Sequence, residues 1–224
     1  MSTAILQRAA AIARSPAKRA FDITFASVGL IVTSPVWLLA MAAISLDDGG
    51  PIYYRQARSG LGGRRFLVWK FRSMITGAER EGALQATRHD ARVTRAGRLL
   101  RATAMDELPQ LWNILRGDMS VVGPRALRPG EVETGPQAPA GGRLEDVPGF
   151  DIRSAVRPGL TGIAQIYAPR DLPRRQKFRY DRLYIHRQSL WLDVRLVLQS
   201  LTITFLGSWE RRGHTRRRIG RGQK

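Results

Sequence analysis

The chain has 224 residues and no cysteine, which suits one compact domain with a real core and excludes a disulfide framework. Its 37 Lys and Arg against 18 Asp and Glu give a net charge of +19, so its partners should be anionic: nucleic acid, anionic lipid or phosphate-bearing substrates. The densest basic cluster lies at 210–218, which we expect to be a solvated or lipid-facing end.

The first feature along the chain is an apolar segment from Phe21 to Leu46, which carries no charged side chain after Asp22. It exceeds the roughly 20 residues that a membrane-spanning helix needs. A soluble helix of this length would show a polar stripe, and this one has only scattered Ser and Thr. The segment therefore indicates membrane insertion, and it is too long for the apolar part of a cleaved signal peptide.

The course of this segment has two interpretations. Ser34-Pro35 lies near its middle, where proline removes a backbone donor, and basic residues flank both ends. The positive-inside rule favours both flanks on the cytoplasmic side, which a helix that enters, breaks at Ser34-Pro35 and returns would satisfy. A kinked single span remains the alternative, since membrane helices tolerate proline.

Short elements are expected next. Two β-prone runs on either side of Gly60-Leu-Gly-Gly63 predict a hairpin within 51–74, and no Gly-Lys-Ser/Thr follows to make the glycines a P-loop. Residues 79–90 are polar and predict a surface helix or loop. Residues 93–102 predict a short helix with an arginine at every third position.

An amphipathic helix is expected to follow, because apolar residues recur at i, i+3, i+4 and i+7 from Leu108. Asp106 suits the N-cap, Pro109 the first turn and Gly117 the stop. Beyond it, the Pro- and Gly-rich stretch 128–149 predicts a long loop and 157–162 a turn. Residues 188–206 predict an apolar helix, either in the core or in the membrane interface.

Few side chains point to chemistry on their own. The adjacent Asp106 and Glu107 would ordinarily cap a helix and complement its dipole, but carboxylates among many arginines also suit Mg²⁺ with a polyphosphate. Lys70 and Arg72 fit either an ordinary strand end or phosphate binding. Asp181 and Tyr184 fit helical packing with a salt bridge. The three histidines lack metal-ligand spacing, and we assign them no role.

Several motifs occur in a fixed order between about Lys18 and Phe205. They are Thr33-Ser-Pro35, Lys70-Phe-Arg-Ser-Met74, Asp106-Glu-Leu-Pro-Gln-Leu-Trp-Asn113, Arg116-Gly-Asp-Met-Ser120, Val122-Gly-Pro-Arg125 and Arg157-Pro-Gly-Leu-Thr-Gly-Ile-Ala-Gln165. Together they resemble the bacterial sugar transferase family, the monotopic polyprenyl-phosphate phosphoglycosyl transferases. The chain begins close to the apolar segment and so resembles the minimal catalytic form.

The resemblance implies an α+β, mostly helical fold: a monotopic membrane protein with an N-terminal re-entrant helix broken at Ser34 and Pro35, interface helices and a small β-hairpin. Residues 1–46 would form the N-terminal segment and re-entrant helix, 47–209 a cytoplasmic catalytic domain and 210–224 a basic tail. The enzyme would lie in the inner membrane with its catalytic domain on the cytoplasmic face. Its partners would be the membrane, a polyprenyl phosphate and a UDP-sugar, without nucleic acid, and it could form a homodimer.

The resemblance also implies transfer of a sugar-1-phosphate from the UDP-sugar to undecaprenyl phosphate, with release of UMP, as the priming step of surface glycans such as O-antigen and exopolysaccharide. Asp106 would be the nucleophile, forming an aspartyl-phosphosugar intermediate, and a Mg²⁺ ligand, with Glu107 assisting. Positions that match substrate- or phosphate-binding residues are Lys70, Arg72, Arg101, Arg125, Arg170, Asp181 and Tyr184.

The chain departs from the family pattern in three places, one of which is the Pro- and Gly-rich stretch 128–149, which lacks the family's usual look. Ala104-Met105 stands where many relatives have Ser-Leu, and Arg170 is displaced by one residue from its usual place. Two other functions were weighed. A nucleic-acid binder would explain the charge but not the apolar segment, and a basic membrane scaffold would not explain the block from Asp106 to Arg125. No motif identifies the sugar.

Overall fold

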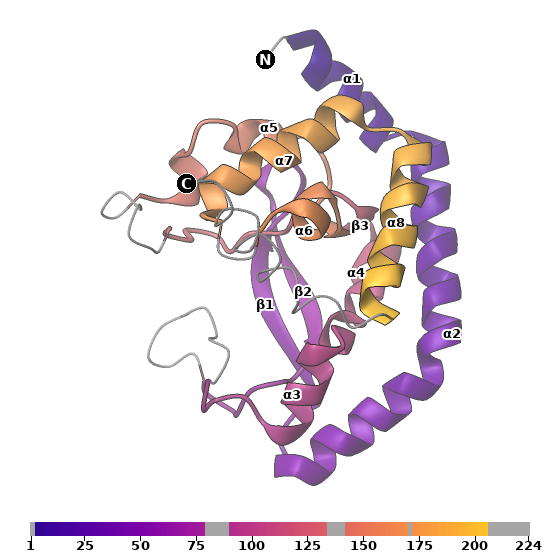
Figure 1. Ribbon diagram of the computed structural model, residues 1–224, viewed down its shortest axis with the longest axis vertical. Coiled ribbons are helices and arrows are strands. Elements are labelled where there is room, and N and C mark those ends of the chain that lie inside the picture. The colour runs from indigo at the N-terminus through magenta and orange to yellow at the C-terminus, as the bar shows by residue number, and fades with distance from the viewer. Residues whose placement is uncertain (1–2, 79–89, 134–141, 170–171, 206–224) are drawn as a thin grey trace, which may run out of the picture.

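The computed structural model describes residues 3–78, 90–133, 142–169 and 172–205. Figure 1 shows one long helix, α2, along a side of the molecule, with α8 beside it and the β1–β2 hairpin in the middle. The remaining helices lie on the inner side of α2. The basic tail from 210 to 224 and most of the polar stretch 79–90 lie outside the described residues.

The N-terminal part consists of α1 (Thr3–Ala13) and α2 (Pro16–Asp48). Ser15 caps α2 by accepting a hydrogen bond from the Lys18 amide, and Gly49 ends it in the left-handed conformation. By length and composition alone α2 could cross a membrane: an 18-residue window has a mean hydropathy of 2.0 and is 11% buried. The predicted long apolar helix is therefore present.

The structure corrects the predicted break at Ser34-Pro35, because α2 stays helical through it. Proline cannot donate to the carbonyl of Ile31, four residues earlier. The Ser34 hydroxyl donates to that carbonyl instead, at 2.8 Å. Figure 1 shows α2 changing direction along its length, so the helix is bent and not interrupted.

Both ends of α2 are attached to the same folded body. Near its start, Arg19 donates to the carbonyls of Ile114 and Leu115 at 2.6 and 2.5 Å. At its end, Asp47 accepts a hydrogen bond from the Ala96 amide at 2.8 Å, and Asp48 binds Arg72, which directly follows the hairpin. The two ends of this apolar helix therefore face one domain.

The hairpin consists of β1 (Tyr53–Ser59) and β2 (Arg65–Phe71), antiparallel, with the 3-10 turn η1 (Leu61–Gly63) between them. This confirms the predicted hairpin. The predicted short helix is also present as α3 (Arg95–Ala102), capped by the Thr94 side chain. Gly97 lets α3 approach the end of the hairpin closely, since a Cβ there would lie 2.1 Å from the Ser73 carbonyl oxygen.

The predicted helix from Asp106 to Gly117 is wrong in its first part. Met105–Glu107 form the 3-10 turn η2, and α4 runs only from Gln110 to Arg116 after Pro109. Asp106 therefore caps no helix. Gly117 does stop α4, with φ at 87°, and one expected apolar position, Trp112, is 51% exposed.

The rest of the chain adds a second small sheet and more helices. Strands β3 (Ser120–Val122) and β4 (Gly159–Thr161) pair in parallel, so the turn predicted at 157–162 is partly a strand. The predicted long loop contains the 3-10 turn η3 (Leu144–Asp146). The helices that follow are α5 (Phe150–Ser154), α6 (Ile163–Tyr167), α7 (Arg174–Arg187) and α8 (Leu190–Phe205).

One main core joins these elements. It contains Ala26 of α2, Val68 of β2, Ile114 of α4, Val121 of β3 and Leu196 of α8, all nearly inaccessible. The first half of α2 thus belongs to the core of the domain. The helix predicted at 188–206 is a core helix on one face, while on other faces Trp191 and Leu198 are 77% and 59% exposed.

Candidate active site

The Asp106–Glu107 pair lies in η2, between the end of α3 and the start of α4. Ala104 precedes it with φ at 57°, the single non-glycine residue with positive φ among the described residues. That conformation costs an L-residue about 1–2 kcal/mol. The chain therefore keeps a strained residue two positions before the carboxylate pair, where backbone strain often accompanies function.

Glu107 forms ion pairs with two basic side chains from distant parts of the chain. Its Oε1 lies 2.6 Å from Lys70 Nζ on β2 and 3.3 Å from Arg125 Nη2, after β3. Burial alone would raise the pKa of Glu107, but the charges of Lys70 and Arg125 outweigh burial and lower it to about 2. Glu107 is thus ionised at neutral pH, and it fixes two basic side chains next to Asp106.

Asp106 is in the opposite situation. Its carboxylate has no hydrogen bond or ion pair with the residues that the structure describes. Burial raises its pKa to about 6, the charge of Glu107 adds to this, and Lys70, Arg101 and Arg125 act in the other direction. An unpaired carboxylate surrounded by cations suits attack on an anionic phosphate.

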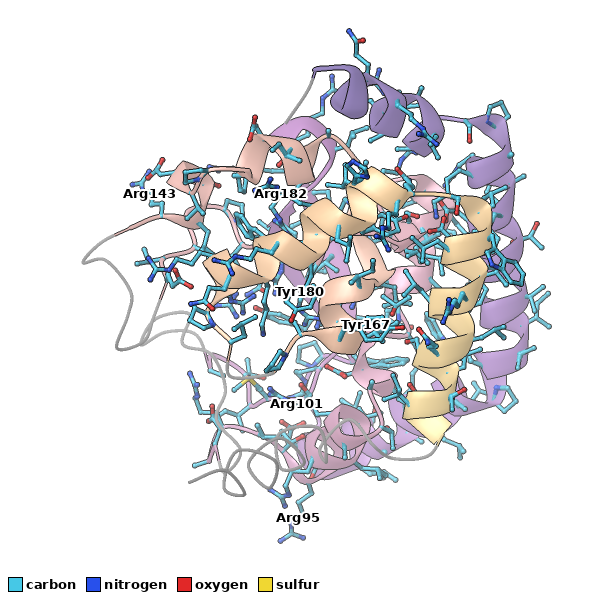
Figure 2. The ribbon with its side chains drawn as sticks, turned by 45° about the horizontal axis from the view of Figure 1, so that its top comes forward. Arg95, Arg101, Arg143, Tyr167, Tyr180 and Arg182 are labelled. Carbon is cyan, nitrogen blue, oxygen red and sulfur yellow. The ribbon has the colours of Figure 1, made fainter. Side chains whose placement is uncertain are left out.

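Arg101 completes this arrangement from the last turn of α3. In Figure 2 Arg101 lies nearer the middle of the molecule, whereas Arg95 at the start of the same helix points away from the body. Of the three arginines at every third position, Arg101 is half-buried and the other two are exposed. The structure therefore brings together four of the predicted site residues around Asp106: Glu107, Lys70, Arg101 and Arg125.

The structure places the other predicted site residues elsewhere. Arg72 is held by both carboxylate oxygens of Asp48 and by the Pro51 carbonyl, at the foot of α2. Asp181 and Tyr184 are 4% and 1% exposed inside α7. Arg170 lies outside the described residues.

A second group of arginines adjoins Arg125. Arg58 donates to the Ala126 carbonyl at 3.1 Å, and Arg174 pairs with Glu131 at 2.8 Å. Burial lowers the pKa of Arg58 to about 10, helped by the charges of Arg125 and its arginine neighbours and opposed by Glu131. Since no described carboxylate pairs with Arg58 itself, the neighbourhood carries excess positive charge.

The donor set fits a magnesium ion only in part. No group of three or more His, Cys, Asp and Glu side chains within the described ranges could hold a metal. Mg²⁺ in phosphate-transfer sites is usually held by one or two carboxylates together with substrate phosphates. Asp106, which is unpaired, fits as such a ligand, whereas Glu107 is already bound by Lys70 and Arg125.

Residues 13–207 match the model of the family described as bacterial sugar transferase. The chain belongs to the bacterial sugar transferase family. The match includes α2, both carboxylates and the basic residues around them.

Three relatives illustrate the range of bacterial sugar transferases. A UDP-glucose:undecaprenyl-phosphate glucose-1-phosphate transferase of Klebsiella pneumoniae is 40% identical over 194 residues, covering 84% of this chain and 40% of the relative. A UDP-N-acetylgalactosamine-undecaprenyl-phosphate N-acetylgalactosaminephosphotransferase of Aeromonas hydrophila is 38% identical over 193 residues, covering 85% and 44%. The exopolysaccharide production protein ExoY of Rhizobium meliloti is 37% identical over 200 residues, covering 83% and 84%.

The chain therefore spans less than half the length of the first two of these sugar transferases and most of the third. The reactions in their names are properties of those proteins.

Sequence reasoning missed the role of one residue beside the candidate site. Asn113 is completely buried and bonds the backbone of β2 on both sides of Val68: it accepts from the Trp69 amide at 2.9 Å and donates to the Leu67 carbonyl at 2.8 Å. It thereby fixes α4 against the strand that carries Lys70. The sequence feature that could have indicated this role is an amide side chain, Asn113, among the apolar residues of the predicted helix.

Proposed function

We propose that this protein is a phosphoglycosyl transferase that moves a sugar-1-phosphate from a UDP-sugar to undecaprenyl phosphate or another polyprenyl phosphate, with release of UMP. The observation that carries the proposal is Asp106, an unpaired carboxylate with a raised pKa, beside the Glu107–Lys70–Arg125 group. The names of the relatives support the two substrate classes. A scaffold or a nucleic-acid binder would have no use for such a carboxylate.

In the proposed reaction, an ionised Asp106 oxygen attacks the β-phosphorus of the UDP-sugar. A bond forms between the Asp106 carboxylate oxygen and the phosphorus, giving an acyl phosphate, while the bond between the β-phosphorus and the bridging oxygen breaks and UMP leaves with that electron pair. A phosphate oxygen of the lipid then attacks the same phosphorus, and the Asp106 carboxylate leaves. Covalent catalysis of this kind divides one difficult displacement into two.

The basic residues make the first attack feasible. A carboxylate and a phosphoanhydride repel each other, and Lys70, Arg101 and Arg125 offset that repulsion around Asp106. Glu107 holds Lys70 and Arg125 in place through its ion pairs. The arginines around Arg58 are suited to the nucleotide's remaining phosphate. Mg²⁺ held by Asp106 and the substrate's phosphates would supply further neutralisation of the phosphate charge.

The proposal includes a monotopic arrangement in which α2 enters and leaves the inner membrane on the cytoplasmic face. A single span would put the two ends of a helix on opposite sides of about 30 Å of hydrocarbon. Here Arg19 at one end and Asp47 at the other both bind the same domain, which supports re-entrance. Apolar side chains between them are largely exposed, for example Ile31, Val32 and Leu39 at 69–72%.

Single cysteines can test the topology, because the natural chain has none. Ser2→Cys and Arg64→Cys, one before α2 and one in the hairpin turn, should both be protected from an impermeant maleimide in intact cells. Both should react after the cells are opened. Labelling of Ser2→Cys from the periplasm would show a spanning helix instead.

The reaction is tested without any lipid acceptor. The enzyme with a UDP-sugar, drawn from a panel that includes UDP-glucose and UDP-N-acetylgalactosamine, should release at most one equivalent of UMP in a burst. The protein should gain the mass of one sugar phosphate on Asp106, and Asp106→Asn should abolish both signals. UMP release that strictly requires lipid, with no adduct after quenching, would show direct transfer. No UMP release with any UDP-sugar and lipid would reject the function.

A further inference from the structure

The backbone segment Ser120–Arg125 positions Arg125, one of the basic residues around Asp106. Arg125 lies at its end, and the side chain is 48% exposed while it contacts Glu107 at 3.3 Å. Few side-chain contacts therefore hold the guanidinium itself. Its position depends on the backbone that carries it, which is buried from Ser120 to Pro124.

An ion pair from α7 holds the end of this segment. Asp181 Oδ2 lies 3.2 Å from Arg153 Nε, and Arg153 donates through Nη2 to the Arg125 carbonyl at 2.5 Å. Asp181 and Arg153 are 4% and 6% exposed, and Arg153 also stacks over the ring of Phe178 at 4.8 Å. The Arg153 side chain, which donates to the Arg125 carbonyl, is thus held in position by Asp181 and Phe178.

One turn further along α7, Tyr184 holds the middle of the segment. Its hydroxyl lies 3.0 Å from the Val122 carbonyl oxygen and 2.9 Å from Asp193 Oδ1. The residue is 1% exposed, so substrate cannot reach it in this conformation. Asp181 and Tyr184 lie three positions apart on one face of α7. Asp181 is linked to the Arg125 carbonyl through Arg153, and Tyr184 contacts the Val122 carbonyl directly.

Asp22 of α2 holds the start of the segment. Its Oδ1 accepts hydrogen bonds from the Ser120 hydroxyl at 2.9 Å and from the Val121 amide at 3.1 Å. Lys18 lies between Asp22 and Asp193, 3.0 and 2.9 Å from their oxygens. The charged cluster thus joins α2 and α8 to β3.

Backbone packing closes the remaining side. The Gly123 amide donates to the Thr161 carbonyl at 2.9 Å. A Cβ on Gly159 would lie 2.0 Å from the Gly123 nitrogen, so β4 leaves no room for the segment to move toward it. The segment is therefore clamped along its length by β4, α7 and α2.

We propose that Asp181 and Tyr184 are positioning residues for Arg125: they act on the reaction through the backbone of Ser120–Arg125 and do not touch the substrate. The argument is the chain of contacts from Asp181 through Arg153 to the Arg125 carbonyl, together with the Tyr184–Val122 contact. It rests on the proposed function in so far as Arg125 offsets phosphate charge there. A role in positioning Arg125 and a role in fold stability alone lead to different effects on the reaction.

A double-mutant cycle separates them. The first-turnover rate of UMP release is measured for Asp181→Asn, Tyr184→Phe, Arg125→Gln and the two double variants, each shown by thermal melting to be folded. Because misplacing a reacting partner by about 1 Å can cost up to ~100-fold, we expect each α7 variant to slow the wild-type enzyme on the order of 10-fold. In the Arg125→Gln background the same change should cost less than about 2-fold, since its effect passes through Arg125.

Glu133→Gln is the matched control. Glu133 is also a buried carboxylate paired with an arginine of α7, Arg175 at 3.4 Å, but it holds no residue of the segment. Its effect on the rate, whatever its size, should be the same factor in both backgrounds. If Asp181→Asn and Tyr184→Phe also act by the same factor in both backgrounds, they act independently of Arg125, and the positioning role is overturned.

A second readout needs no catalysis. Amide hydrogen exchange at Val121 and Gly123 should accelerate at least 10-fold in folded Asp181→Asn or Tyr184→Phe, and not in Glu133→Gln. Unchanged exchange in both α7 variants would overturn the clamp. If the wild-type protein releases no UMP at all, the proposed function fails, while the exchange data still decide whether the clamp exists.

Discussion

In the proposed reaction, the raised pKa of Asp106 makes the first half-reaction sensitive to pH, and Glu107 sets part of that sensitivity. The nucleophile must be ionised, and burial with the charge of Glu107 raises the pKa of Asp106 to about 6. Fewer molecules would then have an ionised Asp106 at pH 5 than at pH 7, so the burst rate should fall as the pH is lowered through this range.

Glu107→Gln should move this profile in a definite direction. It removes the like charge and releases Lys70, whose charge lowers the pKa of Asp106. Charges within about 4–6 Å commonly move a pKa by one unit or more, so the midpoint should move down by at least about one pH unit. At pH 5 the rate relative to the variant's own plateau should therefore be higher than it is in the unsubstituted protein. The plateau itself should fall, since Lys70 and Arg125 lose their partner.

The assay is quench-flow measurement of UMP release between pH 4.5 and 8, at one fixed saturating Mg²⁺ concentration for every variant. Glu131→Gln is the control, because its carboxylate pairs with Arg174 and does not contribute to the pKa of Asp106. That variant should keep the wild-type midpoint. If the midpoint on the acid side of the pH–rate profile is unchanged in Glu107→Gln, or lies at higher pH, the electrostatic reasoning about Asp106 and Glu107 is refuted.

Three further predictions concern stability and topology. Folding raises the pKa of Asp106, so the stability that its neutral form supplies is complete below pH 3.8 and is lost as pH rises through about 6. Because asparagine is always neutral, Asp106→Asn should stabilise the protein by about 1–3 kcal/mol at pH 7.5 and by little at pH 3.5. Thermal melts at the two pH values measure this difference. Asn113→Ala leaves the Trp69 amide and the Leu67 carbonyl without their partner, so it should lower the free energy of unfolding by about 2–4 kcal/mol, measured with urea. A loss of less than about 1 kcal/mol would contradict this prediction. Pro35→Leu restores a backbone donor for the Ile31 carbonyl and should straighten α2, shifting Ser2→Cys toward periplasmic labelling; unchanged labelling would mean that proline does not set the topology.

The elements that the sequence predicted correctly are those defined by local patterns. The hairpin at 53–71 follows from β-prone runs around a glycine turn, and α3 at 95–102 follows from the spacing of its arginines. The three-residue strands β3 and β4 escaped prediction, because their pairing depends on residues about forty positions apart in the chain. Asp106 was wrongly expected to be an N-cap because the apolar spacing continues across Pro109, where the backbone changes from a 3-10 turn to α4.

The roles of individual charges were harder to predict. Lys70 lies in β2 and Arg72 directly follows that strand, yet Lys70 binds Glu107 while Arg72 binds Asp48. Nothing local distinguishes them, since the partner comes from the tertiary fold. Asp22 carried a readable signal: it is the one charge in the apolar segment, four residues after Lys18, and the structure shows it paired with that lysine.

These contacts give α2 a part in the proposed reaction beyond anchoring. The lipid substrate carries its phosphate at the membrane surface and the nucleotide sugar comes from the water phase, so the reacting groups must sit at a fixed height above the bilayer. Asp22 links α2 to the strand that leads to Arg125, and Asp47 links its other end to α3, which carries Arg101. Two of the cations around Asp106 are therefore fixed relative to the helix that would enter the membrane. A helix attached at one end only could not fix this height, because it would leave the domain free to tilt.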